Sequence, residues 1–295
     1  MNSKKIQNLG RIGLFSAALL WGISFVLMKN ILSNIPPLYI LAFRFCGAAL
    51  ILLPACLGKL KKIDKTYLRG GALMGTFLIT GYIFQTYGLR LTTPGKNAFL
   101  TSAYCIIAPF LNWVYIKKRP DKFNAAAAII CLSGIGLISL DGDLRIGAGD
   151  ALTIVCGFFY ALHIVVIAKY VQGRDPLVLA MLQFAQAGML ALAGALIIEP
   201  FPSFATAADI GGLIFLTVVC TAGCLLLQVF GQKYTPPSQA AVILTLESVF
   251  GVLTSVVLFH EILTIRLICG FALTFIAVII SETKLEFLRR KRVNP

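Results

Sequence analysis

Long runs of apolar residues, separated by short polar connections, follow one another along the whole chain. A helix of about 20 apolar residues crosses the hydrocarbon layer of a membrane, whereas the strands of a membrane barrel are segments of about ten residues with alternating polarity. The long runs favour helices. The sequence therefore predicts an all-α integral membrane protein with ten transmembrane helices, at residues 12–28, 38–57, 70–89, 97–116, 123–140, 151–168, 176–198, 210–231, 238–259 and 262–281.

Two distant stretches share a skeleton of identical residues. Residues 85–98 and 228–241 both follow the pattern Q-x2-G-x3-T-x-P-x3-A, at an offset of 143 residues in a chain of 295. At an offset of 139, Trp21 aligns with Tyr160 and Arg44 with Gln183. This indicates a duplication, with one repeat at residues 1–145 and the other at 146–295.

Composition agrees with a membrane location and excludes several classes of function. Hydrophobic residues make up 58% and charged residues 13% of the chain, and the mean hydropathy is +0.88. A soluble fold could not bury so much apolar surface. The net charge of +14 does not indicate a nucleic-acid partner, because no soluble basic domain is present. The eight cysteines lack metal-ligand spacing, so we expect neither a metal nor a cofactor.

The positions of Lys and Arg predict the orientation of the chain. Twenty of them fall in the termini and connections on the amino-terminal side of the membrane, five in connections on the opposite side, and Arg44 inside a predicted helix. Positive charge is enriched in cytoplasmic loops, so both termini are predicted to be cytoplasmic in the cell membrane. Five helices per repeat is an odd number, so the second repeat must be inverted. Inverted repeats commonly enclose a central cavity used for alternating access.

Glu247 and Arg44 are the ionisable residues deepest within the predicted helices. A carboxylate in the bilayer costs about 2.5–3.5 kcal/mol on insertion scales, so Glu247 must face a cavity, pair with a base or carry a proton. It is predicted to bind substrate and to couple transport to protons; a structural carboxyl group is the alternative. Arg44 could bind a substrate carboxylate, cap helix carbonyls or pair with Glu247.

Other polar and aromatic residues are candidates for the wall of the cavity. Spacing places Asn97, Thr101 and Tyr104 on one stripe of the fourth helix, and Tyr104 aligns with Glu247 at the 143 offset. Interhelical hydrogen bonds or ordinary packing would explain the same residues. The predicted substrate-binding residues are Trp21, Gln85, Asn97, Thr101, Tyr104, Tyr160, His163, Gln228 and Glu247.

Several short motifs follow one another in order along the chain: Leu19-Leu20-Trp21-Gly22, Arg44, Ala98-Phe99-Leu100-Thr101-Ser102, Leu244-Thr245-Leu246-Glu247 and Phe259-His260-Glu261. In their order and spacing the chain resembles the ten-helix, EamA-like members of the drug/metabolite transporter superfamily. The resemblance implies two inverted five-helix bundles and efflux of small metabolites such as amino acids, nucleosides or drugs. The chain departs from the family where Ser248, and not proline, follows Glu247, and where Lys117-Lys118-Arg119-Pro120 replaces a glutamate that often closes the fourth helix.

The predicted function is secondary active transport, most simply export, of a small metabolite by alternating access. The expected partners are that solute and the lipid bilayer, with the chain as a monomer or homodimer. A lipid flippase or a membrane-embedded lipid-modifying enzyme is the alternative. The enzyme would need a nucleophile and base or metal ligands, and neither an HExxH nor a GxSxG pattern occurs.

Overall fold

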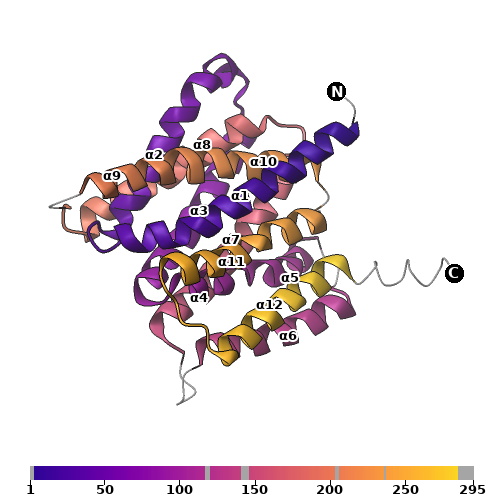
Figure 1. Ribbon diagram of the computed structural model, residues 1–295. Coiled ribbons are helices and arrows are strands. Elements are labelled where there is room, and N and C mark those ends of the chain that lie inside the picture. The colour runs from indigo at the N-terminus through magenta and orange to yellow at the C-terminus, as the bar shows by residue number, and fades with distance from the viewer. Residues whose placement is uncertain (1–2, 117–119, 141–145, 203–205, 236, 285–295) are drawn as a thin grey trace.

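The computed structural model describes residues 3–116, 120–140, 146–202, 206–235 and 237–284. Helices dominate these residues, which include only one isolated β-bridge, between Leu140 and Ile146. Helix α1 begins and α12 ends at the same end of the bundle, here called the terminal end, and the opposite end is called the distal end (Figure 1). Part of the predicted charge asymmetry rests on Lys117, Lys118, Arg119, Arg145 and the basic residues of 285–295, which lie outside the described residues.

Polar side chains and prolines define where most helices of the first half (residues 3–140) begin. Asp64 accepts a hydrogen bond from the Tyr67 N–H, Thr93 caps the helix that opens with Pro94, and Asp121 forms a capping box with Asn124. The elements are α1 (Ser3–Ile31), α2 (Pro37–Cys56), the 3-10 helix η1 (Leu57–Lys62), α3 (Lys65–Leu91), α4 (Pro94–Thr101), α5 (Tyr104–Ile116) and α6 (Lys122–Ser139).

The second half (residues 146–284) uses the same local signals. Asp175, Thr206 and Thr264 cap the helices that follow them. The elements are α7 (Ala148–Tyr170), α8 (Pro176–Ile198), α9 (Ala207–Phe215), the π-helix η2 (Leu216–Gly223), α10 (Cys224–Tyr234), α11 (Pro237–Leu258) and α12 (Ile265–Thr283).

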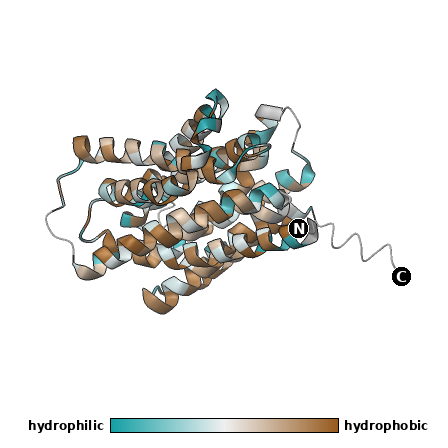
Figure 2. Ribbon diagram, turned by 90° about the horizontal axis from the view of Figure 1, so that it is seen from above, coloured by the Kyte–Doolittle hydropathy of each residue, from teal (hydrophilic) through white to brown (hydrophobic). Residues whose placement is uncertain are grey.

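Seven helical segments among the described residues are long and apolar enough to cross a membrane. They are Lys5–Ile31, Pro37–Lys61, Pro94–Val114, Lys122–Ser139, Ala148–Tyr170, Pro176–Ile198 and Ala207–Tyr234. Two shorter apolar helices, Val242–Leu258 and Ile265–Ser281, follow. Hydrophobic residues run along the helices, as Figure 2 shows. The all-helical membrane architecture is confirmed, and the count of ten crossings stays a prediction.

Two of the predicted helices are not continuous α-helices. The segment predicted at 97–116 breaks between Thr101 and Tyr104, where the N–H groups of Ser102 and Ala103 bond to the carbonyls three residues earlier. The segment predicted at 210–231 contains the π-helix η2. Such π-helical and 3-10 turns within helices often occur at functional sites.

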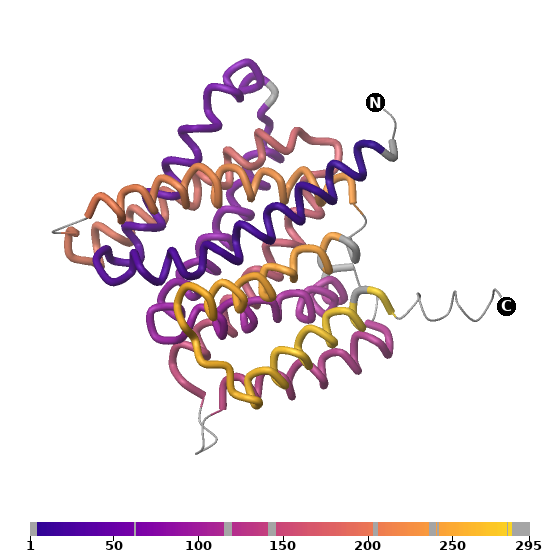
Figure 3. The backbone as a smooth tube through the Cα atoms, in the orientation of Figure 1, coloured from indigo at the N-terminus to yellow at the C-terminus, as the bar shows by residue number. Residues whose placement is uncertain are grey.

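The two halves pack against each other along their whole length. Helix α1 packs against α10 and α11, while α7 packs against α3, α4 and α5, and the outer pairs are α2 with α8 and α6 with α12. Figure 3 shows α1 running beside the α9–α10 segment. Small residues permit the close approaches: a Cβ atom on Gly22 of α1 would lie 2.9 Å from the backbone nitrogen of Gly251 in α11 and would also overlap Phe250.

We expect Gly22→Ala to lower the thermal unfolding midpoint of the detergent-solubilised protein by several degrees. The added methyl group meets backbone atoms, which cannot rotate away, and overpacking of this kind costs about 1–3 kcal/mol. Gly211→Ala in α9 is the matched control, since a Cβ there meets nothing within 4 Å and alanine favours a helix. Equal midpoints for the two variants would contradict the close packing of α1 on α11.

Candidate functional site

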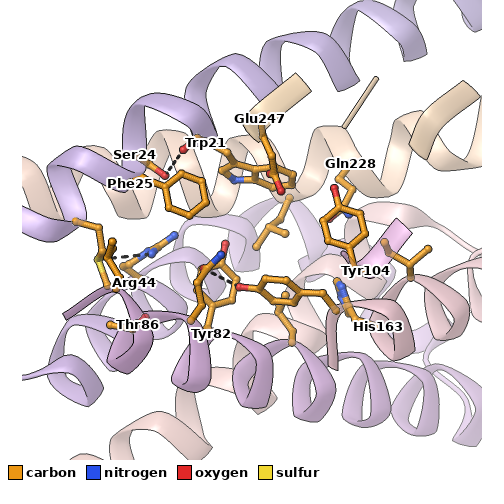
Figure 4. Close-up of a pocket in the computed structure, with 17 residues that line it drawn as sticks. Trp21, Ser24, Phe25, Arg44, Tyr82, Thr86, Tyr104, His163, Gln228 and Glu247 are labelled. Atoms are coloured by element: carbon orange, nitrogen blue, oxygen red, sulfur yellow. Dashed lines mark hydrogen bonds between the residues drawn. The ribbon is translucent and has the colours of Figure 1, made fainter. Parts of the chain in front are cut away.

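A pocket lies between the two halves, where seven helices meet. Its lining comes from α1, α2, α3 and α5 of the first half and from α7, α10 and α11 of the second. Aromatic and polar side chains project into it (Figure 4). The lining residues are Trp21, Ser24, Phe25, Met28, Arg44, Leu78, Tyr82, Gln85, Thr86, Leu89, Tyr104, Tyr160, His163, Ile164, Leu225, Gln228 and Glu247.

Residues that the repeat equates lie in this one pocket. The 139 offset pairs Trp21 with Tyr160 and Ser24 with His163, and the 143 offset pairs Gln85 with Gln228 and Tyr104 with Glu247. All eight side chains line the pocket, although the members of each pair are about half the chain apart. Seven of the nine residues predicted from sequence as substrate-binding are therefore brought together.

Glu247 occupies the middle of α11 and is 6% exposed. Its carboxyl group interacts with the side chain of its repeat partner Tyr104, and in Figure 4 the Tyr104 hydroxyl points towards it. The structure describes three ion pairs, Lys59–Asp175, Lys96–Asp150 and Lys284–Asp121, and Glu247 belongs to none of them. Among the described residues, this buried carboxyl group of the pocket therefore has no basic partner within salt-bridge distance.

Arg44 is the buried cation of the pocket, at 3% exposure. Its Nε donates to the hydroxyl of Thr221 at 3.0 Å, and its guanidinium carbon lies 4.9 Å from the centre of the Tyr82 ring. Thr221 lies in the π-helix η2 and donates to the carbonyl of Leu216, five residues earlier. The guanidinium is held on one edge by a hydroxyl and on one face by a ring. The Arg44–Glu247 pair considered from sequence is not among the ion pairs of the described residues.

Gln85 holds one wall of the pocket in place. Its Nε2 donates to the Thr101 hydroxyl at 3.1 Å, and its Oε1 accepts a hydrogen bond from the Tyr160 hydroxyl at 2.9 Å. The Asn97 side-chain amide donates to the main-chain carbonyl of Gln85 at 3.2 Å and to the Thr153 hydroxyl at 2.7 Å. Gln85 therefore joins α3 to α4 and α7.

The structure corrects the prediction of a continuous polar stripe on the fourth helix. Asn97 and Thr101 are on α4, are almost fully buried and lie behind the pocket lining. Tyr104 opens α5, after the break at Ser102, and is the member of the three that reaches the pocket. The break changes the direction of the side chains, so a spacing of three or four residues across it no longer keeps them on one face.

His163 lines the pocket on α7 and forms a 2.9 Å hydrogen bond between its Nε2 and the Oε1 of Gln183. Gln183 is the repeat equivalent of Arg44. Its Nε2 is buried without a partner. The arginine site of the first half therefore has a neutral counterpart in the second, and the pocket is asymmetric in charge.

Sequence reasoning missed Tyr82, Thr86, Phe25 and Met28 as lining residues. Helical spacing could have found Tyr82, which lies three residues before Gln85 and so on the same face of α3. It could also have found Met28, which follows Ser24 by one turn. Nothing in the sequence indicates the π-helix that presents Thr221 to Arg44.

The distal end of the bundle is tied by carboxylates that cross from one half to the other. Glu199 accepts hydrogen bonds from the N–H of Leu38 at 2.8 Å and from the Tyr87 hydroxyl at 2.6 Å. Asp150 accepts from the Thr92 hydroxyl at 2.5 Å, and Glu261 accepts from the Gly95 N–H at 3.0 Å. Such charge-assisted bonds are stronger than neutral ones, so they hold the two halves together at the distal end.

A second cavity opens at the terminal end, between α1, α7, α10 and α11. Gln7, Gln172 and Lys233 line it, and Ile164 lines both this cavity and the central pocket. Ion pairs also tie the two halves at this end: Lys59 on η1 pairs with Asp175 before α8, and Lys284 pairs with Asp121 before α6. Burial acts to raise the pKa of Asp175, but Lys59 and the Leu177 N–H hold it below its usual value, which keeps the pair charged at neutral pH.

Comparison with known proteins settles the family. The sequence profile of the EamA-like transporter family matches residues 8–140 and again residues 147–283. The chain belongs to the EamA-like transporter family. An uncharacterized transporter of Archaeoglobus fulgidus is 34% identical over 275 residues, which cover 91% of this chain and 84% of that protein.

More distant relatives of this EamA-like chain agree. The uncharacterized transporter YoaV of Bacillus subtilis is 23% identical over 288 residues, covering 95% of this chain and 98% of that protein. A solved crystal structure matches with a TM-score of 0.69 at 16% identity, over 95% of this chain and 98% of the other, which shows a shared fold. Family membership and the apolar helices identify a multi-pass membrane protein and support a role as a membrane transporter.

Proposed function

We propose that this protein is a secondary transporter that moves a small polar organic solute, outward across the cell membrane, by alternating access of the central pocket. The observation that carries the proposal is the pocket itself, which is built from equivalent residues of both halves and holds Arg44 and Glu247 with no ion pair between them. Buried charges in a membrane protein mark a substrate or ion pathway. A bound solute would supply the missing counter-charges.

The proposed architecture is ten crossings in two inverted repeats, residues 1–145 and 146–295. The start of α1 lies beside the end of α7, because Gln7 and Gln172 line the same cavity, so the first helices of the two halves run in opposite directions. This supports inversion. Two inverted halves can pack in two nearly equivalent ways, each of which opens the shared pocket to one side.

A cavity at the terminal end supports an arrangement in which the pocket communicates with that end. This cavity shares Ile164 with the pocket, and carboxylates tie the two halves together at the distal end. With both termini in the cytoplasm, this is an inward-open arrangement. Solute would enter from the cytoplasm, and release would require the bonds of Glu199, Asp150 and Glu261 to break.

Glu247 is proposed to couple transport to protons. A carboxyl group buried beside Tyr104 is far less costly in its protonated form, so loss of the proton favours states in which water or a solute amine reaches it. Exchange of one proton for one solute would then drive export. Arg44 keeps its charge throughout and is proposed to bind an anionic group of the solute.

Counterflow into proteoliposomes tests the proposed function. Vesicles preloaded with an unlabelled amino acid, nucleoside or quaternary amine are diluted into the radiolabelled compound, with empty liposomes as the control. We expect labelled solute of at least one class to enter the vesicles that contain protein. Translocation of a fluorescent phospholipid without solute counterflow would instead support a flippase.

A further inference from the structure

The two equivalent glutamines of the pocket differ in how their amide groups are used. Both atoms of the Gln85 amide are engaged, the nitrogen by Thr101 and the oxygen by Tyr160. Gln228 lines the same pocket and is 6% exposed, and among the described residues its buried Oε1 has no hydrogen-bond partner. A buried acceptor without a partner is unfavourable and is rarely kept in a protein without a reason.

The sequence of the second half explains why Gln228 lacks the partners of Gln85. The residue that corresponds to Thr101 at the 143 offset is Leu244, which has no hydroxyl group. The counterpart of Tyr160 at the 139 offset is Trp21, and its Nε1 donates to the carbonyl of Cys220 at 2.8 Å, not to Gln228. Both of the groups that satisfy Gln85 are therefore replaced or directed elsewhere.

Gln228 lies in a defined part of the pocket. In Figure 4, Gln228, Tyr104 and Glu247 lie on one side, and Arg44 lies on the other. Glu247 and the Gln228 oxygen are acceptors, whereas Arg44 can only donate. The pocket thus offers acceptors at one side and a cationic donor at the other.

We infer that Gln228 is a specificity-determining residue that accepts a hydrogen bond from an N–H group of the solute, while Gln85 is a structural residue. The inference rests on the proposed transport function and adds to it the chemistry of one subsite. The solute has an ammonium group that retains N–H donors beside Gln228 and Glu247 and an anionic group beside Arg44. A quaternary ammonium group, which has no N–H, leaves the Gln228 oxygen unpaired.

Two matched substitutions separate the roles of the glutamines. The ligands are L-phenylalanine, chosen because aromatic rings line the pocket, and its N,N,N-trimethyl betaine. Calorimetry measures the binding of each to the purified full-length protein. We expect the parent to prefer phenylalanine about tenfold, as one hydrogen bond to a charged donor allows. Gln228→Met should remove this preference without lowering the unfolding midpoint of the ligand-free protein, because it removes an unpaired buried acceptor. Gln85→Met should lower that midpoint and keep the preference.

The outcomes distinguish this inference from the proposed function. The role of Gln228 is overturned if Gln228→Met keeps the preference for phenylalanine over the betaine. It is also overturned if Gln228→Met lowers the unfolding midpoint as much as Gln85→Met does. Failure of the parent to bind phenylalanine, together with counterflow of a nucleoside, overturns the inference and leaves the transport proposal standing. Failure of every solute in counterflow overturns the proposed function.

Discussion

Glu247→Gln is expected to abolish proton-driven accumulation of solute while leaving solute exchange intact. Glutamine has nearly the same shape and can still bond to Tyr104, but it cannot release a proton. A difference of one pH unit across the membrane stores about 1.4 kcal/mol per proton. If one proton is exchanged for one solute without net charge, this energy supports about tenfold accumulation of the solute. The parent should reach this ratio in proteoliposomes, and Glu247→Gln should equilibrate without accumulation.

Glu261→Gln is the matched control for this experiment. It makes the same chemical change at a residue outside the pocket. Glu261 lies in the connection after α11, at the distal end, where it accepts a hydrogen bond from the Gly95 N–H. We expect Glu261→Gln to retain proton-driven accumulation at equilibrium, even where the rate changes. Accumulation by Glu247→Gln equal to that of the parent would exclude Glu247 as the coupling residue.

Arg44→Lys is expected to weaken binding of a carboxylate-bearing solute by about 10- to 100-fold, the range of one to two charge-assisted hydrogen bonds. Lysine keeps the positive charge but lacks the planar fork that binds a carboxylate through two N–H groups. It also cannot reproduce the bond from Nε to Thr221 that orients the guanidinium. Calorimetric titration with phenylalanine, and with phenylalaninamide as the ligand without a carboxylate, measures the effect.

The amide is the decisive comparison for Arg44. If the guanidinium binds the carboxylate, the substitution weakens binding of phenylalanine and leaves the already weaker binding of phenylalaninamide almost unchanged. Arg174→Lys, at the terminal end and against Tyr67, should alter neither. A similar loss for both ligands in Arg44→Lys would mean that Arg44 shapes the pocket through Thr221 and Tyr82 without contacting the solute.

Much of the pocket could be predicted because the membrane makes polar residues conspicuous. Glu247 and Gln228 stand out in apolar helices, where each polar group needs a partner or a cavity. The 143-residue offset of the repeat pairs Tyr104 with Glu247 and Gln85 with Gln228, and all four residues line the pocket. The same reasoning identifies the all-helical membrane class, since the length of an apolar run depends on sequence alone.

The remaining features depend on contacts that a one-dimensional pattern does not contain. The break at Ser102 places Asn97 and Thr101 behind the lining, although regular helical spacing predicts that they share a face with Tyr104. The partner of Arg44 is Thr221, which is 177 positions away and lies on a π-helix. The difference between Gln85 and Gln228 likewise arises from neighbours on other helices.

The central claim is that one pocket opens alternately to the two sides of the membrane. It is tested most directly with Ser24→Cys in a variant whose eight native cysteines are replaced, labelled by a membrane-impermeant thiol reagent applied to either side. Ser24 lines the pocket on α1. We predict labelling from the side of the termini in the absence of solute, and labelling from the distal side as well when solute and a proton gradient drive turnover. Labelling from one side under every condition would contradict alternating access.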